Sequence, residues 1–389
     1  MKKKFMNNKI WSRRASKVIF PSAQSYLNIL SPDEYPRYFF KAKGPYVWDV
    51  DGNKYIDVFL GSGAIIIGHG NEELMSAIRI QLDNGASVSM RHPAEVEVAE
   101  WFSNALPFAN RIAYFKTGSE ATHAALRISY NITKKPYILS LGYHGWLTPF
   151  EDVFNCHVKV IKMEWEMDRI EKTFAKLRGN ISAIIVSPEP YQLSKKFYQW
   201  LYDITKTYDV FFIADEIKSG FRLAFPSFFH SIRINPDICL FGKAVSNGFP
   251  LSILACKEEV LEKYNFDYFS TFGGEPVSLI AARETIKILE NGAYRKYEEY
   301  SQYVFSKLNI VLKRSNIDLR GVPTFFRLIY PSSEYGLLFA KRLAEKGVLL
   351  HPYDDFLISS AHDKIIISKI IQVITETLNE MSKERRDNS

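Results

Sequence analysis

The sequence predicts an α/β protein, with a large domain built on a mainly parallel sheet and a smaller α+β domain attached to it. Two observations support this prediction: a series of buried-strand patterns in the middle of the chain, and a different pattern in its last hundred residues. From about residue 110, seven short apolar runs alternate with stretches of helical spacing. Strands that are buried on both faces and joined by helices form parallel sheets. The runs occupy residues 112–115, 137–141, 158–161, 181–186, 210–214, 238–241 and 251–256.

The two ends of the chain carry other patterns. Residues 1–40 are polar and irregular, and residues 46–57 predict a hairpin, because an alternating strand is followed by an Asp-Gly-Asn turn. Helical spacing occurs at 71–85, 94–106, 276–312, 334–346 and 363–382, and short strand-like segments at 324–329 and 348–350. We therefore expect residues 1–70 and 286–389 to form the small domain and residues 71–285 to form the large one.

The composition is that of an ordinary folded protein. Of the 389 residues, 47% are hydrophobic and 24% are charged, which excludes a disordered or low-complexity chain. The formal net charge is +7, and much of the excess lies at the chain ends, so we expect solvated tails and no nucleic-acid partner. The longest apolar run, Val58 to Ile67, is too short for the roughly 20 residues that span a bilayer. Three widely spaced cysteines indicate a reducing compartment, so we expect a cytoplasmic protein that binds no membrane.

Two of the predicted strands are followed by groups that could bind an anion or a cation. Residues 117–122 (Thr-Gly-Ser-Glu-Ala-Thr) open a helical stretch, and such a helix start suits a phosphate, although an ordinary N-cap has the same pattern. Asp215 directly follows the run at 210–214. An acid at that position could bind a metal, act as a base, pair with a cationic ring nitrogen, or simply cap a helix.

Two further strands are followed by a lysine and by an aromatic pair. Lys243 follows a glycine after residues 238–241; a desolvated lysine forms a Schiff base, whereas most such lysines are solvated. Tyr143 and His144 follow residues 137–141, where a ring could stack on a planar ligand or pack in the core. No zinc, hydrolase or Walker motif is present, so we expect no metal site. A phosphate site, an acid, a lysine and an aromatic ring together fit pyridoxal phosphate (PLP).

These segments resemble class III (subgroup II) PLP-dependent aminotransferases, and most closely their glutamate-1-semialdehyde aminomutase branch. The resemblance covers roughly residues 36–380 and implies fold type I with a seven-stranded sheet. The matching segments, in chain order, are 43–57, 67–69, Thr117-Gly118-Ser119-Glu120-Ala121, Tyr143-His144-Gly145, Glu189-Pro190, Asp215-Glu216, Gly220-Phe221-Arg222, Pro236-Asp237, Gly242-Lys243, Gly248-Phe249-Pro250, 270–274 and 359–362.

The resemblance also implies a role for each matched residue. Lys243 would form the Schiff base with PLP and move the proton during the reaction, and Asp215 would pair with the protonated pyridine nitrogen. Tyr143 would stack on the ring. The remaining implied cofactor residues are Gly118 and Ser119 at the phosphate, Glu189 near the acid, and Thr271, which would reach the phosphate of a neighbouring subunit in a homodimer with shared sites. His144 and Arg222 match the family and are interpreted as structural.

The sequence departs from this family where substrates are distinguished. The loop after Glu189-Pro190 reads Tyr-Gln-Leu-Ser-Lys-Lys at 191–196, and the common Gly-Asn-Pro is Gly-Glu-Pro at 274–276. Arg91 and Arg327 are the candidates for binding a substrate carboxylate. We expect an aminotransferase that takes nitrogen from an amino-acid donor to an aldehyde or ketone in a specialised biosynthetic pathway. An intramolecular aminomutase and a non-catalytic scaffold remain as alternatives.

Overall fold

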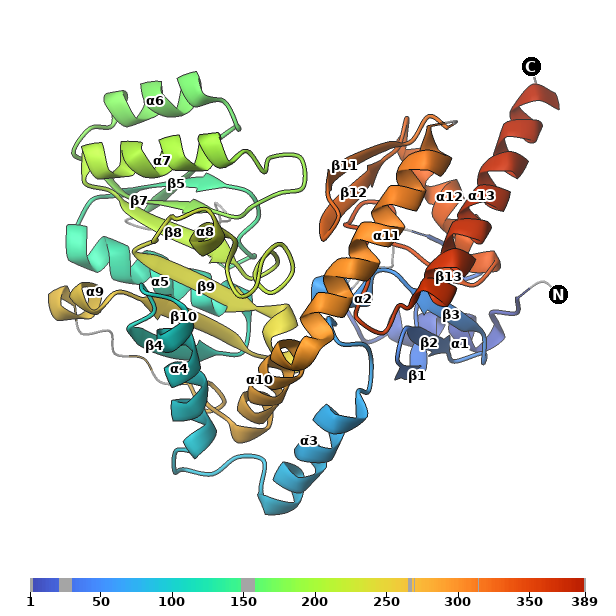
Figure 1. Cartoon of the computed structure of the whole chain (residues 1–389), viewed down its shortest axis with the longest axis horizontal. Helices are drawn as coiled ribbons and strands as arrows, with labels where there is room; N and C mark the ends of the chain where they lie inside the picture. Colours follow the sequence, from blue (N-terminus) through green and yellow to red (C-terminus); the bar gives the residue numbers. More distant parts are fainter. Residues whose placement is uncertain are drawn as a thin grey trace. The chain divides into compact units, whose positions relative to one another are not determined.

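The computed structural model describes residues 3–20, 30–147, 158–264, 268, 270–313 and 315–387 (Figure 1). The chain divides into two compact units. The first consists of Met1–Glu72 and Ile288–Ser389, and the second of Glu73–Lys287. Cys239 and Cys256 are buried free thiols, and Cys156 lies outside the described residues.

The second unit contains a seven-stranded sheet in the order β4-β10-β9-β8-β7-β5-β6. Its strands are β4 (Arg111–Phe115), β5 (Tyr137–Leu141), β6 (Lys159–Lys162), β7 (Ile181–Val186), β8 (Phe211–Glu216), β9 (Ile238–Gly242) and β10 (Ser252–Cys256). Only β10 is antiparallel to its neighbours in this sheet. The predicted fold class is thereby confirmed, because each of the seven apolar runs forms a strand.

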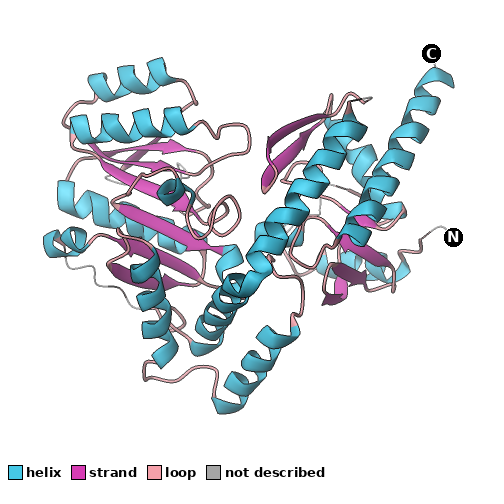
Figure 2. Ribbon diagram, in the orientation of Figure 1, coloured by secondary structure: helices cyan, strands magenta, loops and turns pink. Residues whose placement is uncertain are grey.

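Helices lie on both faces of this sheet, as the ribbon colours of Figure 2 show. The helices in this part of the chain are α3 (Glu72–Asn84), α4 (Pro93–Ala105), α5 (Gly118–Thr133), α6 (Met167–Lys176), α7 (Lys195–Tyr208), α8 (Phe228–Ser231), α9 (Glu258–Lys263) and α10 (Pro276–Ile288). In Figure 1, α3 lies away from the sheet and α6 lies beyond α7. Successive residues of a strand point to opposite faces. In β8, Ile213 joins the core cluster that contains the buried face of α5, whereas Phe212 packs edge-on against Tyr202 of α7 and Phe229 of α8.

The first unit is smaller and mixes helices with short strands. Its four-stranded sheet has the order β1-β2-β3-β13, in which β3 pairs antiparallel with β2 and parallel with β13. Its elements are α1 (Met6–Ala15), β1 (Phe39–Lys43), β2 (Tyr46–Asp49), β3 (Lys54–Asp57), α2 (Leu60–Gly63), α11 (Tyr294–Leu312), β11 (Asp318–Val322), β12 (Phe325–Ile329), α12 (Ser333–Glu345), β13 (Val348–Leu349) and α13 (Lys364–Asp387). The helices of the described ranges include none that is both long enough and apolar enough to cross a membrane.

Three expectations about the chain ends need correction. Residues 1–40, expected to be irregular, contain α1, which polar contacts anchor: Asp51 accepts the backbone N–H groups of Asn7 and Asn8 at 2.7 and 2.9 Å. The strands β1 and β11 were not expected, because their residues are mostly exposed or half-buried and lack a buried apolar run. The expected helix over 276–312 is interrupted by a π-turn at Leu289–Ala293, where Gly292 has a φ of +103°.

Candidate active site

Most of the sequence-predicted site residues lie at one edge of the seven-stranded sheet. The strands β5, β7, β8 and β9 are parallel, and β4 runs in the same direction because β10 is antiparallel to both β4 and β9. Their carboxyl ends therefore meet at one edge, which is where open α/β sheets bind ligands. The predicted residues at this edge are Gly118, Ser119, Tyr143, Glu189, Asp215 and Lys243.

Ile217, just after β8, brings the ends of three strands together. A Cβ added at Gly118 would lie 2.8 Å from Ile217 Cδ1, and one added at Gly242 would lie 3.2 Å from Ile217 Cγ2. Glycine at both positions lets β4, β8 and β9 end close to this side chain. Lys243 follows Gly242 directly and is half-buried. Its φ is +49°, a conformation that non-glycine residues rarely adopt and that concentrates at functional sites.

Asp215 is buried and held by two described donors. His144 Nδ1 lies 2.7 Å from its Oδ2, and the backbone N–H of Ile217 donates to its Oδ1 at 3.1 Å. The side chain of His144 is completely buried. A buried carboxylate is costly unless it is hydrogen-bonded and faces a positive group. This carboxylate therefore suits a ligand that carries a cationic or protonated nitrogen.

The amino end of α5 forms a small cup, which we define as the backbone of Thr117, Gly118 and Ser119. Thr117 and Glu120 make a capping box, in which each side chain accepts from the other residue's backbone N–H. The backbone N–H groups of Gly118 and Ser119 lie in the first turn of α5 and, as at every helix start, have no carbonyl acceptor within the helix. These N–H groups and the helix dipole can together bind an anion.

The loop after β5 closes tightly against this cup. Ser119 Oγ accepts from the backbone N–H of Trp146 at 3.4 Å, and Thr122 Oγ1 donates to the carbonyl of His144 at 2.9 Å. Gly145 has a φ of +94°, and a Cβ there would lie 2.2 Å from Ser119 Oγ. Any side chain at Gly145 would therefore push the loop away from the cup.

Tyr143 and Glu189 lie beside this region, on the loops after β5 and β7. Tyr143 is 67% exposed. Glu189 is half-buried, and its carbonyl accepts from the backbone N–H of Gln192 at 2.9 Å in a tight turn. Burial, followed by the charge of Glu189, raises the pKa of the Tyr198 hydroxyl, which donates to the Gln192 carbonyl at 2.7 Å.

Thr271 is exposed and starts a turn that packs against the end of β4. A Cβ at Gly273 would lie 2.9 Å from the carbonyl oxygen of Tyr114, so the turn approaches the strand closely. At the end of the turn, Glu275 forms an ion pair with Lys116, with 2.8 Å between Oε1 and Nζ. The turn is thus tied to the residue that precedes the cup.

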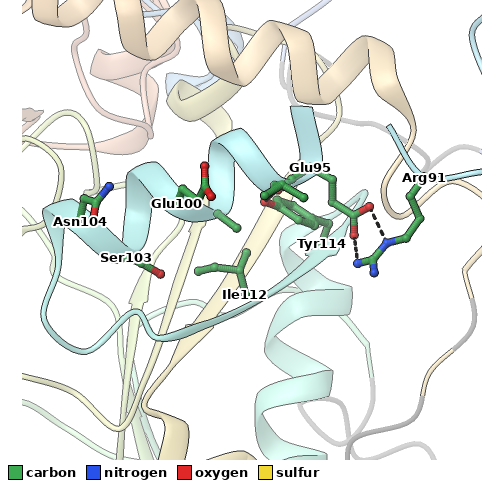
Figure 3. Close-up of a pocket in the computed structure, with 9 residues that line it drawn as sticks. Arg91, Glu95, Glu100, Ser103, Asn104, Ile112 and Tyr114 are labelled. Carbon is green, nitrogen blue, oxygen red and sulfur yellow. Dashed lines mark hydrogen bonds and ion pairs between the residues drawn. The ribbon is translucent and has the colours of Figure 1, made fainter. Parts of the chain in front are cut away.

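Arg91 lies at an open pocket of about 390 Å³ between α4 and the edge strand β4 (Figure 3). Its guanidinium makes two hydrogen bonds to the carboxylate of Glu95, at 2.9 and 2.5 Å, and its side chain is 85% exposed. Neither Lys243 nor Asp215 lines this pocket. A substrate carboxylate would have to compete with Glu95 for Arg91.

Arg327 belongs to the other unit, on β12. Its Nε donates to Oδ1 of the fully buried Asp355 at 2.8 Å. Both arginines that we considered for substrate binding thus already pair with a carboxylate. The described part of the chain holds no group of three His, Cys, Asp or Glu side chains that could bind a metal ion.

Sequence reasoning missed two residues of this arrangement. From the sequence, His144 is interpreted as structural and its contact with Asp215 is not predicted, and Ile217 is not named. A signal for His144 was present, since it lies within the Tyr-His-Gly segment that matched the family. No sequence pattern pointed to Ile217, because its role is to contact two glycines from distant strands.

Solved structures of transaminases have the same fold. A transaminase solved with PLP bound superposes with a TM-score of 0.88 at 19% identity, over 98% of this chain and 99% of that one. An omega-transaminase from Sphaerobacter thermophilus gives 0.84 at 20% identity, over 94% of this chain and 96% of that one. The likeness at this identity concerns the fold.

The residues at the sheet edge fit PLP. The cofactor needs an amine for its aldehyde, an anion partner for its ring nitrogen and donors for its phosphate. Lys243, the buried Asp215 and the amides of the cup are groups of these three kinds. Glycine at 145 lets the loop after β5 lie directly against Ser119 of the cup, because any side chain there would clash with Ser119.

Characterised relatives match the chain over nearly its whole length. It is 29% identical to a glutamate-1-semialdehyde 2,1-aminomutase of Methanothrix thermoacetophila, over 92% of this chain and 93% of the relative. It is 28% identical to a 3-aminobutyryl-CoA aminotransferase of Cloacimonas acidaminovorans, over 90% and 91%. The family model for class III aminotransferases matches residues 31–149 and 147–381. The chain therefore belongs to the class III aminotransferase family, whose cofactor is PLP.

Proposed function

We propose that this protein is a PLP-dependent aminotransferase that moves an amino group from an amino-acid donor to an aldehyde or ketone acceptor. The observation that carries the proposal is the arrangement of Lys243 and Asp215. Asp215 is the next-to-last residue of β8 and is paired in register with Leu240 of β9, and Lys243 comes two residues after Phe241 of β9. An amine and a buried carboxylate therefore lie at adjacent strand ends, beside a cup of backbone amides.

Each residue would act through a defined atom. When bound, PLP supplies an aldehyde that reacts with amines and a ring that accepts electrons. Lys243 Nζ would hold the cofactor and take up the proton released from the substrate carbon. The Asp215 carboxylate would hold the ring nitrogen in its protonated form, and His144 would keep that carboxylate oriented. Electrostatic pairing of this kind is most effective where water is excluded, as at the buried Asp215.

The other predicted residues would complete cofactor binding. Gly118 and Ser119 would donate backbone N–H groups to the phosphate, the exposed ring of Tyr143 would stack on the cofactor, and Glu189 would lie near its ring oxygen. Thr271, on an exposed turn, would reach the phosphate of a second copy, which makes the working unit a homodimer. Light scattering of the purified protein tests this last point, because a stable monomer with full activity would contradict it.

The decisive experiment replaces Lys243. Wild-type protein with PLP should show a visible absorption band that shifts when an amino donor is added. Lys243→Ala should lose both the band and the reaction with donor. Lys206→Ala is the matched control, since Lys206 pairs with Asp237 before β9, at the other end of that strand, and should leave the spectrum unchanged. Transamination retained in full by Lys243→Ala would rule out the proposal.

An aminomutase is the second candidate, supported by the 29% identical relative of that name. The two reactions differ in where the nitrogen goes, because an intramolecular shift needs no second substrate. Turnover of an amino aldehyde without any external donor or keto acid would establish the mutase. Strict dependence on both partners would establish the transferase. The altered loop at 191–196 supports a substrate from a specialised pathway.

A further inference from the structure

The ion pair between Lys116 and Glu275 connects segments that are far apart in the sequence. The distance from Lys116 Nζ to Glu275 Oε1 is 2.8 Å, and the two side chains are only 16% and 13% exposed. Burial lowers the pKa of Lys116, although Glu275 opposes the shift. Burial would raise the pKa of Glu275, but hydrogen bonds from Lys116 and Ser278 outweigh it and the pKa is lowered. The pair is thus an ion pair that is largely shielded from solvent.

Lys116 is fixed to the cup through its backbone. Its N–H donates to Oε2 of Glu120 at 3.1 Å, and the N–H of Thr117 donates to the same oxygen at 2.7 Å. Its side chain extends in another direction, since Nζ also donates to the carbonyl of Pro250 at 3.1 Å. Pro250 lies in the stretch of chain between Lys243 and the start of β10. Lys116 therefore links the cup to the loop after the Schiff-base lysine.

Glu275 is fixed to the start of α10. Its carboxylate accepts the backbone N–H groups of Val277 at 2.7 Å and Ser278 at 3.0 Å. It ends the turn that begins at Thr271. Displacement of the Glu275 carboxylate would thus be transmitted to both the turn and the first residues of α10.

We propose that Lys116 and Glu275 are a positioning pair. The pair holds the cup where it binds the phosphate of its own subunit's PLP, and it holds the Thr271 turn where it reaches the phosphate of the second copy. The inference rests on the proposed function, because it needs PLP as the ligand. The pair contributes no net charge, so its effect is to fix geometry. Breaking it should weaken binding of the phosphate end of the cofactor and leave the ring end nearly unchanged.

Comparing PLP with pyridoxal, which has the same ring and aldehyde but no phosphate, isolates this effect. The dissociation constants of both are measured by absorbance on the full-length chain stripped of cofactor. In Lys116→Met and in Glu275→Gln, the constant for PLP should rise about tenfold, and that for pyridoxal less than about twofold. Lys116→Arg keeps the positive charge, so this variant should retain most of the wild-type affinity for PLP.

Lys257→Met is the matched control. Lys257 forms an ion pair with Asp237 of the same length, 2.8 Å, and its side chain is 24% exposed. It directly follows β10 and pairs with the residue that precedes β9, so this ion pair lies at the edge of the sheet opposite Lys243. This variant should lower the melting temperature without changing the ratio of the two dissociation constants. If Lys116→Met did not fold, Glu275→Gln would serve alone, since its amide oxygen still accepts from α10.

The outcomes separate this inference from the proposed function. An unchanged PLP-to-pyridoxal ratio in Glu275→Gln, with wild-type protein binding PLP normally, would overturn the positioning role alone. Equal losses for both ligands would also overturn it, because they would place the effect at the ring. Wild-type protein that binds no PLP would overturn the cofactor assignment and this inference with it.

Discussion

Each of the two units contains a histidine–aspartate pair, and the distances between nitrogen and oxygen in the two pairs are nearly the same. In the second unit, His144 Nδ1 lies 2.7 Å from Oδ2 of the buried Asp215. In the first unit, His69 Nε2 lies 2.8 Å from Oδ2 of the buried Asp57. His144 has no exposed surface, and the His69 side chain is 15% exposed. Judged by this contact alone, the two sites are equivalent.

They differ in what else the carboxylates bind. Asp57 Oδ1 accepts two backbone N–H groups, those of Phe59 and Leu60, both at 2.9 Å. Asp215 Oδ1 accepts one described N–H, at 3.1 Å. A carboxylate has about four acceptor positions. Asp57 is therefore nearly saturated and acts as a clamp on its own chain, whereas Asp215 has two described donors.

The largest expected effect comes from Asp215→Asn. The amide preserves size but removes the charge that would stabilise a protonated ring nitrogen. We expect the reaction with amino donor to slow by about 10²–10³-fold, with cofactor still bound and with little change in melting temperature. Stopped-flow absorbance measures the rate. A rate within threefold of wild type would show that Asp215, like Asp57, is only structural.

A third buried carboxylate, that of Glu216, extends the comparison, because its ionisation should make the stability of the protein depend on pH. Glu216 accepts from Ser227 Oγ and from the backbone N–H groups of Phe228 and Phe229. No histidine is among its described partners, and burial raises its pKa from the ordinary 4.5 to about 7 despite these donors. The folded state thus favours the protonated acid, so the stabilisation is complete below pH 4.5 and is lost as pH rises to 7.

Glu216→Gln should remove this dependence. Between pH 4.5 and 7, wild-type protein should lose about 3 kcal/mol of stability relative to the variant. Urea denaturation at a series of pH values measures the difference. Parallel stability curves for the two proteins over this range would show that the Glu216 carboxylate is not titrating in the folded state.

Asp57→Asn should have a smaller effect with the opposite pH trend. Burial would raise the pKa of Asp57, but the hydrogen bond and charge of His69 outweigh it, so the pKa is lowered. The stabilisation is therefore present above the ordinary pKa and is lost as pH falls through the folded value. We expect the substitution to lower the free energy of unfolding by about 2 kcal/mol at neutral pH and by less in acid. An altered cofactor spectrum in this variant would contradict the structural role.

Sequence patterns predicted the parts of the fold that depend on local hydrophobicity. The run at 181–186 forms β7 with every residue buried, so its pattern is unambiguous. The helix α1 was missed because polar groups hold it: the buried Asn8 amide donates to the carbonyls of Pro32 and Tyr35. Periodicity of apolar residues cannot reveal an anchor of this kind.

The candidate site was predictable residue by residue but not as a set of contacts. Lys243 and Asp215 stand in motifs that mark them as chemically distinctive. The contact of His144 with Asp215 joins residues 71 positions apart and depends on the alignment of β5 and β8 through β7. The pair of Lys116 and Glu275 spans 159 positions. Such contacts follow from strand order, which the sequence does not specify.

The smallest expected effect, and the most direct test of the comparison, comes from replacing the two histidines in the same way. His144→Gln keeps a donor for Asp215 but loses the ring that fixes its direction. We expect affinity for PLP and for pyridoxal to fall together by about tenfold, because both ligands carry the ring nitrogen. His69→Gln should leave both affinities unchanged and lower stability by about 1 kcal/mol.

A joint loss of PLP and pyridoxal affinity in His144→Gln would differ from the phosphate-selective loss expected for Lys116→Met, so the two variants map the two ends of the cofactor. If His69→Gln and His144→Gln lowered stability equally and neither changed ligand affinity, His144 would be a clamp like His69. Asp215 would then owe its orientation to the backbone N–H of Ile217, because that is its other described donor. The difference between the two pairs would in that case lie in the saturation of the carboxylates alone.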